Sequence, residues 1–333
     1  MATSLNDTSG TIGQTVIDVT SMIEHAVRRC GVSAALITAE QMSSARDNLF
    51  LILSGLATRG LSLWCVTKLS LGTEAGRLEY TLPVGTVDVL QALYRRATPY
   101  AATTVGLGAA TLTPASSIAI TSVLVRPAAL GTYDLELQGS PDGVSWTTAG
   151  TATVVYDGAT VPGVDATLVV TYPFWRVRDV RDPTRAIDAA TFFSDPYEIP
   201  MSKLSRDDYA NLPNKTFSSQ WPLQYWYDKQ FYQPKLVLWP VPTEQRVVRV
   251  FLQSQIQDPG AFVNAVQVPQ RWLDAVISLL APRVCLELPK ELVDSSRHGK
   301  LEEIAERTLR AAEDSETDGA PIRLAPNISP YTR

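Results

Sequence analysis

Residues able to carry out acid–base or nucleophilic chemistry are few and scattered in this 333-residue sequence. The two histidines, His25 and His298, stand near opposite ends of the chain, and no serine or cysteine motif accompanies either. A general base needs an orienting partner within hydrogen-bond reach, and a nucleophile needs such a base beside it. The sequence therefore predicts two solvated helix residues and no histidine-based catalysis.

Carboxylates gather toward the C-terminus in two groups. The first is Glu287, Glu291 and Asp294, and the second is Glu302, Glu303, Glu306, Glu313, Asp314, Glu316 and Asp318. A metal site or a glycosidase pair would use such residues, so a hydrolase is one interpretation. The polar face of amphipathic helices gives the same pattern, and we favour that interpretation.

Two further patterns have a possible role in binding phosphate groups. The segment 106–108, Gly-Leu-Gly, resembles a fragment of a dinucleotide fingerprint but lacks the third glycine and a following helix, so we interpret it as a linker. A spaced basic group consists of Arg176, Arg178, Arg181 and Arg185. Such a group could contact phosphates. Its first two members alternate with Val177, however, as outward-facing residues of a half-buried strand do.

The cysteine spacing, the net charge and the lack of long apolar runs argue against several classes of protein. Cys30, Cys65 and Cys285 lack the spacing of a disulfide framework or a zinc site and predict buried free thiols in a reducing cytoplasm. A net charge of −5 argues against a protein that wraps duplex nucleic acid, but not against a ring through which DNA slides. The polar N-terminus and the lack of an apolar run of about 18 residues predict no signal peptide and no membrane span. We expect no cofactor, no metal and no enzymatic activity.

The elements that must position these residues are helices at both ends of the chain and strands between them. Apolar residues recur at helical spacing over 16–29, 39–59, 269–288 and 298–314. Strand patterns occupy 62–67, 77–82 and 87–94, and strands at 235–239 and 246–253 are expected to form a hairpin. The chain is thus predicted to be α+β, with a helical core and a small sheet.

The segment 97–182 differs from its surroundings because it is rich in Thr, Val, Ala and Gly and has no helical periodicity. Its strand patterns, at 118–125, 133–138, 151–156 and 167–179, predict a small all-β sandwich. We therefore expect a discontinuous core domain, 14–96 plus 183–314, interrupted by an inserted sandwich at 97–182. A flexible N-terminus, 1–13, and an extended C-terminal tail, 315–333, complete the predicted organisation.

Aromatic residues concentrate between positions 207 and 242, which hold nine of the 27 in the chain. No catalytic residue type is clustered with them. Tryptophan and tyrosine are common anchors of protein interfaces. The sequence predicts subunit-interface aromatics at Trp221, Tyr225, Trp226, Tyr227 and Trp239.

Residues 133–146, YDLELQGSPDGVSW, resemble the discoidin-type (galactose-binding-like) β-sandwich. In that family a strand runs into a Ser-Pro-Asp-Gly turn, here Ser140 to Gly143, and a tryptophan, here Trp146, packs back on the core. Residues 171–178 look like a late strand of the same fold. The resemblance implies either a module that binds glycans or proteins through its loops or a rigid decoration. No binding residue can be carried over.

Six further segments follow one another along the chain, at 53–61, 80–83, 205–209, 222–230, 236–242 and 268–275. In their order they resemble the head-to-tail adaptors of short-tailed phages, also called tail accessory, DNA-stabilisation or tail tubular A-like proteins. The inserted sandwich departs from a minimal adaptor and raises the question of whether such a protein would be only a spacer.

This second resemblance implies a virion structural protein at the head–tail junction, assembled in the host bacterial cytoplasm. It would form a ring, twelve-fold in symmetry, under the portal protein, extend the DNA channel, help to retain packaged DNA and offer a platform to tail, nozzle or fibre proteins. Double-stranded DNA would pass without sequence-specific contacts. Portal docking is expected at Leu301, Ile304, Leu309, Ile322 and Leu324.

Two alternatives to an adaptor remain open at this point. One is a glycan-binding module that recognises a host surface through the sandwich. The other is a hydrolase that uses Glu287 or Glu291.

Overall fold

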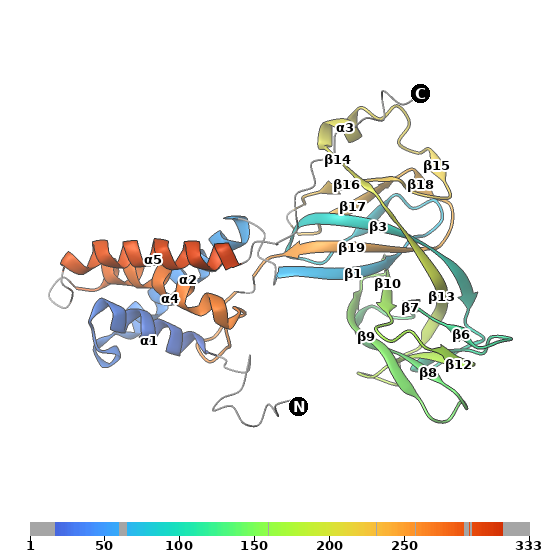
Figure 1. Cartoon of the computed structure of the whole chain (residues 1–333), viewed down its shortest axis with the longest axis horizontal. Helices are drawn as coiled ribbons and strands as arrows, with labels where there is room; N and C mark the ends of the chain where they lie inside the picture. The colour runs from blue at the N-terminus through green and yellow to red at the C-terminus, as the bar shows by residue number, and fades with distance from the viewer. Residues whose placement is uncertain are drawn as a thin grey trace, which may run out of the picture. The chain divides into compact units, whose positions relative to one another are not determined.

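A computed structural model describes residues 17–59, 65–158, 160–230, 232–256, 258–289, 293 and 295–315. They belong to two compact units, a helical unit of Met1–Cys65 with Ile256–Arg333 and a β unit of Val66–Gln255 (Figure 1). The predicted domain boundaries at 97 and 182 do not coincide with these units, because strands from 97–182 share sheets with strands on both sides of that segment.

The helical unit contains α1 (Val19–Cys30), α2 (Ala39–Arg59), α4 (Gln270–Glu287) and α5 (Ser295–Ser315), with a short 3-10 turn, η2 (Ala34–Leu36). All four predicted helices are confirmed within a few residues at each end. The Asp18 carboxylate accepts a hydrogen bond from the Ser21 amide at 3.1 Å and begins α1, and Gly31 ends it at φ +87°. None of the helices in the described ranges is both long and apolar enough to cross a membrane.

Apolar faces of these helices meet in one core. Its members include Met22 and Ile23 of α1, Leu49 and Leu53 of α2, and Leu280 of α4. The three cysteines are buried and free, as predicted.

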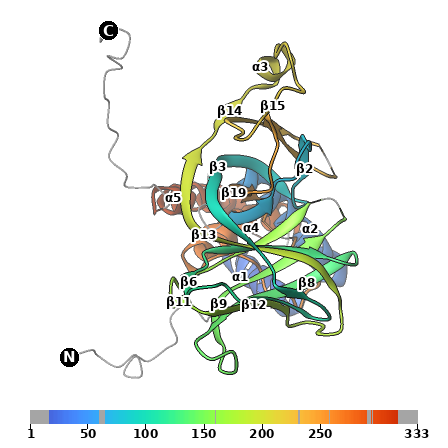
Figure 2. The same cartoon turned by 90° about the vertical axis from the view of Figure 1, so that its right-hand side faces the viewer.

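Six strands of the β unit close a barrel. Their order around it is β1 (Val66–Gly72), β10 (Val161–Asp165), β7 (Ser122–Pro127), β13 (Ile187–Pro200), β3 (Thr86–Ala101) and β19 (Val247–Ser254). All neighbours in this ring are antiparallel. Figure 2 shows β13 as one long strand that passes beside β3 and leads to β14 (Ser202–Leu204). Because β3 and β13 have 16 and 14 residues, they extend past the shorter barrel strands.

A five-stranded sheet forms a sandwich with part of this barrel. Its order is β4 (Thr104–Val105), β5 (Ala109–Leu112), β12 (Phe174–Asp179), β8 (Gly131–Ser140) and β9 (Thr147–Tyr156). Trp175 and Tyr133 from this sheet share a buried core with Val123 and Phe192 from the barrel. The predicted β-sandwich is therefore present, but barrel strands supply one of its layers. Two short strands, β6 (Ile118–Ala119) and β11 (Thr171–Tyr172), pair beside it.

The predicted tryptophan of the sandwich core is the wrong one. Trp175 is fully buried there, whereas Trp146 is only half-buried and stacks with the Arg176 guanidinium, 4.1 Å from the ring centroid. The turn that precedes Trp146 forms as expected. The Ser145 and Val144 amides donate to the Asp142 carboxylate at 2.7 and 2.9 Å and, with Ser140, lower the pKa of that carboxyl to about 2.

A four-stranded sheet covers the other side of the barrel, in the order β14, β16 (Gln224–Asp228), β17 (Lys235–Trp239) and β2 (Glu79–Thr81). The predicted hairpin of 235–239 with 246–253 is wrong, since β17 pairs with β16 and β2, and β19 pairs with β1 and β3. Leu236 and Leu238 of β17 instead share a core with Val248 and Val250 of β19. Facing layers bury both apolar faces, which a flat hairpin cannot do. Beside this sheet lie the short helix α3 (Arg206–Ala210) and the pair β15 (Ser218–Ser219) and β18 (Val241–Pro242).

Candidate functional site

The barrel interior is apolar on one side and charged on the other. Ala97, Leu124, Val161, Phe193 and Val247 form its apolar cluster. Side chains two residues along a strand lie on the same face. The same inner face therefore carries Arg95 next to Ala97 on β3, Arg249 next to Val247 on β19, and Ser122 next to Leu124 on β7.

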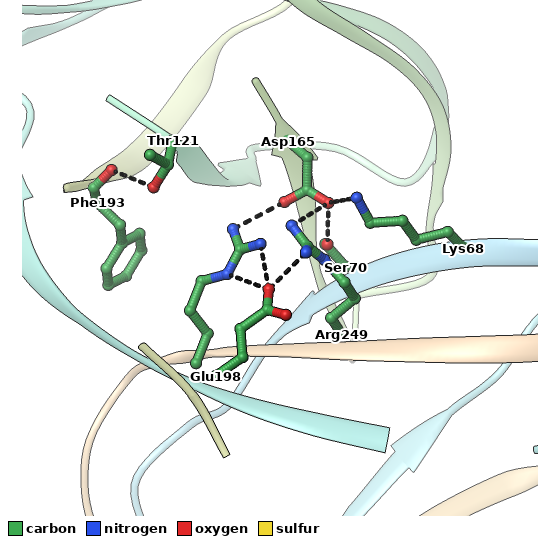
Figure 3. Close-up of polar contacts among 8 residues, drawn as sticks. Lys68, Ser70, Thr121, Asp165, Phe193, Glu198 and Arg249 are labelled. Atoms are coloured by element: carbon green, nitrogen blue, oxygen red, sulfur yellow. Dashed lines mark hydrogen bonds and ion pairs between the residues drawn. The ribbon is translucent and has the colours of Figure 1, made fainter. Parts of the chain in front are cut away.

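Five charged side chains and one serine form what we call the barrel ion network. Its members are Lys68, Ser70, Arg95, Asp165, Glu198 and Arg249. Asp165 contacts Arg95 at 3.2 Å, Arg249 at 3.1 Å and Lys68 at 3.0 Å, and accepts a hydrogen bond from Ser70 at 2.7 Å. Glu198 pairs with Arg95 at 2.7 Å and with Arg249 at 2.5 Å. Figure 3 shows Asp165 and Glu198 in contact with these groups from several strands. Since each of its charged groups pairs with at least one opposite charge from another strand, the network is suited to holding barrel strands together.

A second group of polar and aromatic side chains lies at an irregularity between β3 and β13. The pairing register shifts between Ser194, which lies opposite Thr98, and Tyr197, which lies opposite Arg96. Two residues of β13 thus oppose Ala97 alone, which is a β-bulge. Asp195, within the bulge, has φ +49°, a left-handed conformation that few non-glycine residues adopt. Such strain is often found beside functional sites, where the surrounding structure enforces it.

A hollow of about 480 Å³ lies beside this bulge, and we call it the bulge pocket. Its lining comprises Arg96, Ala97, Thr98, Pro99, Asp195, Tyr197 and Arg246. Tyr197 is 68% exposed, so its ring is available to a ligand. The pocket combines guanidinium donors, a carboxylate acceptor and an aromatic face on neighbouring strands. That set can hold a polyhydroxylated molecule by hydrogen bonds and ring contact.

The sequence contained one signal for this pocket that periodicity does not capture. Asp195-Pro196 interrupts an aromatic strand pattern, and proline inside a strand marks an edge or a bulge. The arginines of the pocket gave no signal, because Arg96 and Arg246 are 150 positions apart (246 − 96) and meet only through the pairing of β3 with β19.

The predicted interface aromatics separate into two sets. Tyr225 and Tyr227 are buried in the core beneath the four-stranded sheet, so their rings are committed within the β unit. Trp221, Trp226 and Trp239 are half-buried.

On the outer face of the four-stranded sheet, the indole rings of Trp226 on β16 and Trp239 on β17 contact other aromatic rings. Trp226 stacks on Tyr209 with centroids 4.6 Å apart, and Trp239 lies 6.2 Å from Phe217. We call Tyr209, Phe217, Trp226 and Trp239 the aromatic surface.

The predicted portal-docking residues differ in their exposure to solvent. Leu301 and Leu309 belong to the core of the helical unit, so their side chains already pack within the chain. Ile304 is 37% exposed and remains accessible. Ile322 and Leu324 lie outside the described residues.

The two histidines and the Gly106–Gly108 segment do not form a site for chemistry. His25 is exposed on α1, and His298 lies 3.8 Å from Glu302 one turn along α5. The Gly106–Gly108 segment is neither a phosphate loop nor a loose linker, because it is the turn between β4 and β5, with Gly108 at φ +68° against Pro183.

The arginines at 176 and 178 lie on a strand and pair with neighbouring side chains, and the C-terminal carboxylates form no metal site among the described residues. Arg176 donates to Gln138 at 2.7 Å and Arg178 pairs with Glu136 at 2.7 Å across neighbouring strands. Glu287 accepts a hydrogen bond from Asn48, whereas Glu291 lies outside the described residues. Within the described part of the chain, no cluster of three or more His, Cys, Asp or Glu residues could hold a metal ion.

No protein-family model matches the chain, and no curated protein matches it. Among solved structures, the chain is similar to a family 89 glycoside hydrolase from Clostridium perfringens, with 12% identity and a TM-score of 0.23. That similarity covers 39% of this chain but only 14% of the hydrolase.

Two smaller structures are similar over comparable parts of the chain. The C-terminal domain of a chitobiase from Bacteroides fragilis has 14% identity and a TM-score of 0.20, over 32% of this chain and 74% of that domain. CBM32-1 from a family 31 glycoside hydrolase of Clostridium perfringens has 10% identity and a TM-score of 0.21, over 36% of this chain and 96% of that module. TM-scores this low carry no conclusion about what the present chain binds.

Proposed function

We propose that this chain is a non-enzymatic binding protein that recognises a saccharide at the bulge pocket. The observation that carries the proposal is the exposed Tyr197 ring beside the Asp195 carboxylate and the Arg96 guanidinium on two adjacent strands. Three of the seven lining residues lie inside the 97–182 segment and four lie outside it, so recognition would be a property of the whole β unit.

The physical argument is a match of chemical groups. A sugar ring has an apolar face of C–H groups, which packs against an aromatic ring, and a rim of hydroxyls, which donate to carboxylates and accept from guanidinium groups. Tyrosine offers a rigid ring at low entropic cost, and a planar guanidinium offers paired donors. Because the bulge fixes Asp195 and Tyr197 in place, little ordering is needed when a ligand binds.

Tyr197→Ala is expected to weaken saccharide binding about tenfold or more, the usual effect of truncating an anchoring aromatic residue. The measurement is binding of the full chain to a glycan array, followed by calorimetry on the best ligand. Tyr232→Ala, at a second highly exposed tyrosine of the same unit, is the matched control and should bind as the unchanged chain does. Equal binding by Tyr197→Ala would exclude the pocket, and an array without any ligand would exclude saccharide recognition.

A second candidate, favoured by the aromatic surface, is a structural subunit of a larger assembly. Trp226 and Trp239 hold half-buried rings on the outer face of the four-stranded sheet, and Phe217 beside them is half exposed. Aromatic side chains of this kind are typical anchors of subunit interfaces. Together with the resemblance of the motif order to phage head-to-tail adaptors, this supports a ring-forming virion protein that contacts a portal.

For this second candidate we expect a monomer that becomes part of a stoichiometric ring when it is mixed with the portal protein of its own phage. Light scattering of the chain, the portal and the mixture measures the masses. The double variant Trp226→Ser with Trp239→Ser should not join the ring, whereas Trp146→Ser, in the turn between β8 and β9, should join normally. A chain indifferent to the portal would leave saccharide recognition as the sole proposal.

A further inference from the structure

We propose that the bulge pocket selects a carboxylate-bearing saccharide, such as one containing uronic acid residues, and that Arg96 binds its carboxylate. This inference rests on the saccharide recognition proposed above and adds the chemical class of the ligand.

Arg96 is the first part of the argument. Its guanidinium lies over the Trp221 ring, 4.9 Å from the centroid, so its flat face is occupied. No carboxylate in the described part of the chain lies within ion-pair distance of it. Arg95, the preceding residue on β3, contacts both Asp165 and Glu198. The Arg96 edge therefore keeps its N–H donors for an external acceptor, and its positive charge is not neutralised locally.

Arg246 is the second part. One terminal nitrogen pairs with Glu244 at 2.6 Å and the other donates to the Ala97 carbonyl at 3.2 Å, so the side chain is held firmly at the pocket. Its Nε is buried, so this nitrogen is closed to a ligand. Arg246 therefore shapes the wall of the pocket and leaves Arg96 as the guanidinium open to a ligand.

The charges of the pocket lining decide between a neutral and an acidic sugar. Arg246 is already paired with Glu244, whereas neither Arg96 nor Asp195 belongs to an ion pair in the described part of the chain, so the charge of Arg96 is the one open to an anionic group. Hydrogen bonds between guanidinium and carboxylate are short, frequently bidentate and stronger than those to a neutral hydroxyl. Asp195 and Tyr197 would then contact the hydroxyls and the ring of the same sugar.

The test compares trimers of galacturonate, glucuronate and mannuronate with the neutral trimers of the same linkage, by calorimetry on the full chain. We expect one of the acidic trimers to bind on the order of tenfold more tightly than its neutral counterpart. Arg96→Gln should lower the affinity for the acidic trimer far more than that for the neutral trimer and so remove the preference. Arg310→Gln, at an exposed arginine of α5, is the control and should keep the preference.

Each outcome bears on one of the two proposals. Equal affinity for acidic and neutral trimers, or a uniform loss in Arg96→Gln, would overturn the charge selection and leave saccharide recognition intact. Binding of sulfated but not carboxylated trimers would show that the anion is not a carboxylate and would overturn the inference. If no saccharide binds at all, both proposals fail together.

Discussion

Asp165→Asn is expected to lower the free energy of unfolding of the β unit by about 3–5 kcal/mol, the usual cost of removing one partner from a buried ion pair. Asp165 is the centre of the barrel ion network, with contacts to Lys68, Arg95 and Arg249 and a hydrogen bond from Ser70. Its replacement leaves three cations facing Glu198 alone. The like charges then repel in surroundings that screen them poorly.

The balance of cations and carboxylates in the network predicts which variant loses more stability, and this order differs from the one that burial alone would give. Arg95 is only 3% exposed, yet Arg95→Met leaves two cations with two carboxylates and should cost less than Asp165→Asn. Glu79→Gln removes the exposed pair with Lys235, at 2.7 Å, and should cost less than about 1 kcal/mol.

Urea unfolding followed by tryptophan fluorescence would measure these differences, since five of the seven tryptophans lie in the β unit. A loss for Asp165→Asn no larger than that for Glu79→Gln would contradict the proposed role of the network. A larger loss for Arg95→Met would contradict the charge count.

Trp175→Ala should destabilise the sandwich by about 3–5 kcal/mol because it removes the largest fully buried side chain of the β unit. The lost side chain fills the core between the five-stranded sheet and the barrel. Its indole N–H also donates to the carbonyls of Ile118 and Tyr172 at 3.0 and 3.2 Å, and its ring meets Tyr172 edge-on at 5.5 Å. Truncation therefore leaves a cavity and two carbonyls without this donor.

Trp146→Ala provides the matched control, because Trp146 lies half-buried on the outer face of the same sandwich. Its replacement loses mainly the contact with Arg176, which amounts to about 1 kcal/mol. Thermal unfolding of the two variants and the unchanged chain would measure the difference. Similar losses for both tryptophans would mean that Trp175 does not anchor the core.

The two candidate functions use different faces of the β unit and can be tested independently. The proposed saccharide recognition would depend on Tyr197 and Arg96 at the bulge. The proposed assembly would depend on Trp226 and Trp239 on the four-stranded sheet. Variants of one face should leave the other activity unchanged, since sites without shared partners act additively. A chain that shows both activities would carry a recognition site within a structural subunit.

The sequence by itself determined the helices, and the reason is that their signals are local. The apolar spacing within 16–29 and 39–59 repeats within one turn or two, and caps such as Asp18 and Gly31 lie next to the ends they fix. The turn at Asp142 was visible for the same reason, because its donors come from the next three residues.

Only the tertiary structure decided the barrel and its sites. β10 is a short Val-Pro-Gly-Val-Asp segment with no strand alternation, and it becomes a strand because β1 and β7 pair with its two edges. Asp165 then meets residues from positions 68 to 249, which no periodicity relates. In the same way Trp226 and Tyr227 are adjacent in sequence, but Trp226 is half-buried and Tyr227 is buried. The reason is that one face of the sheet is turned to water and the other to the core. The positions of aromatic and charged residues were thus readable from the sequence, but which of them pack inside and which lie on the surface depended on strand pairings between distant segments.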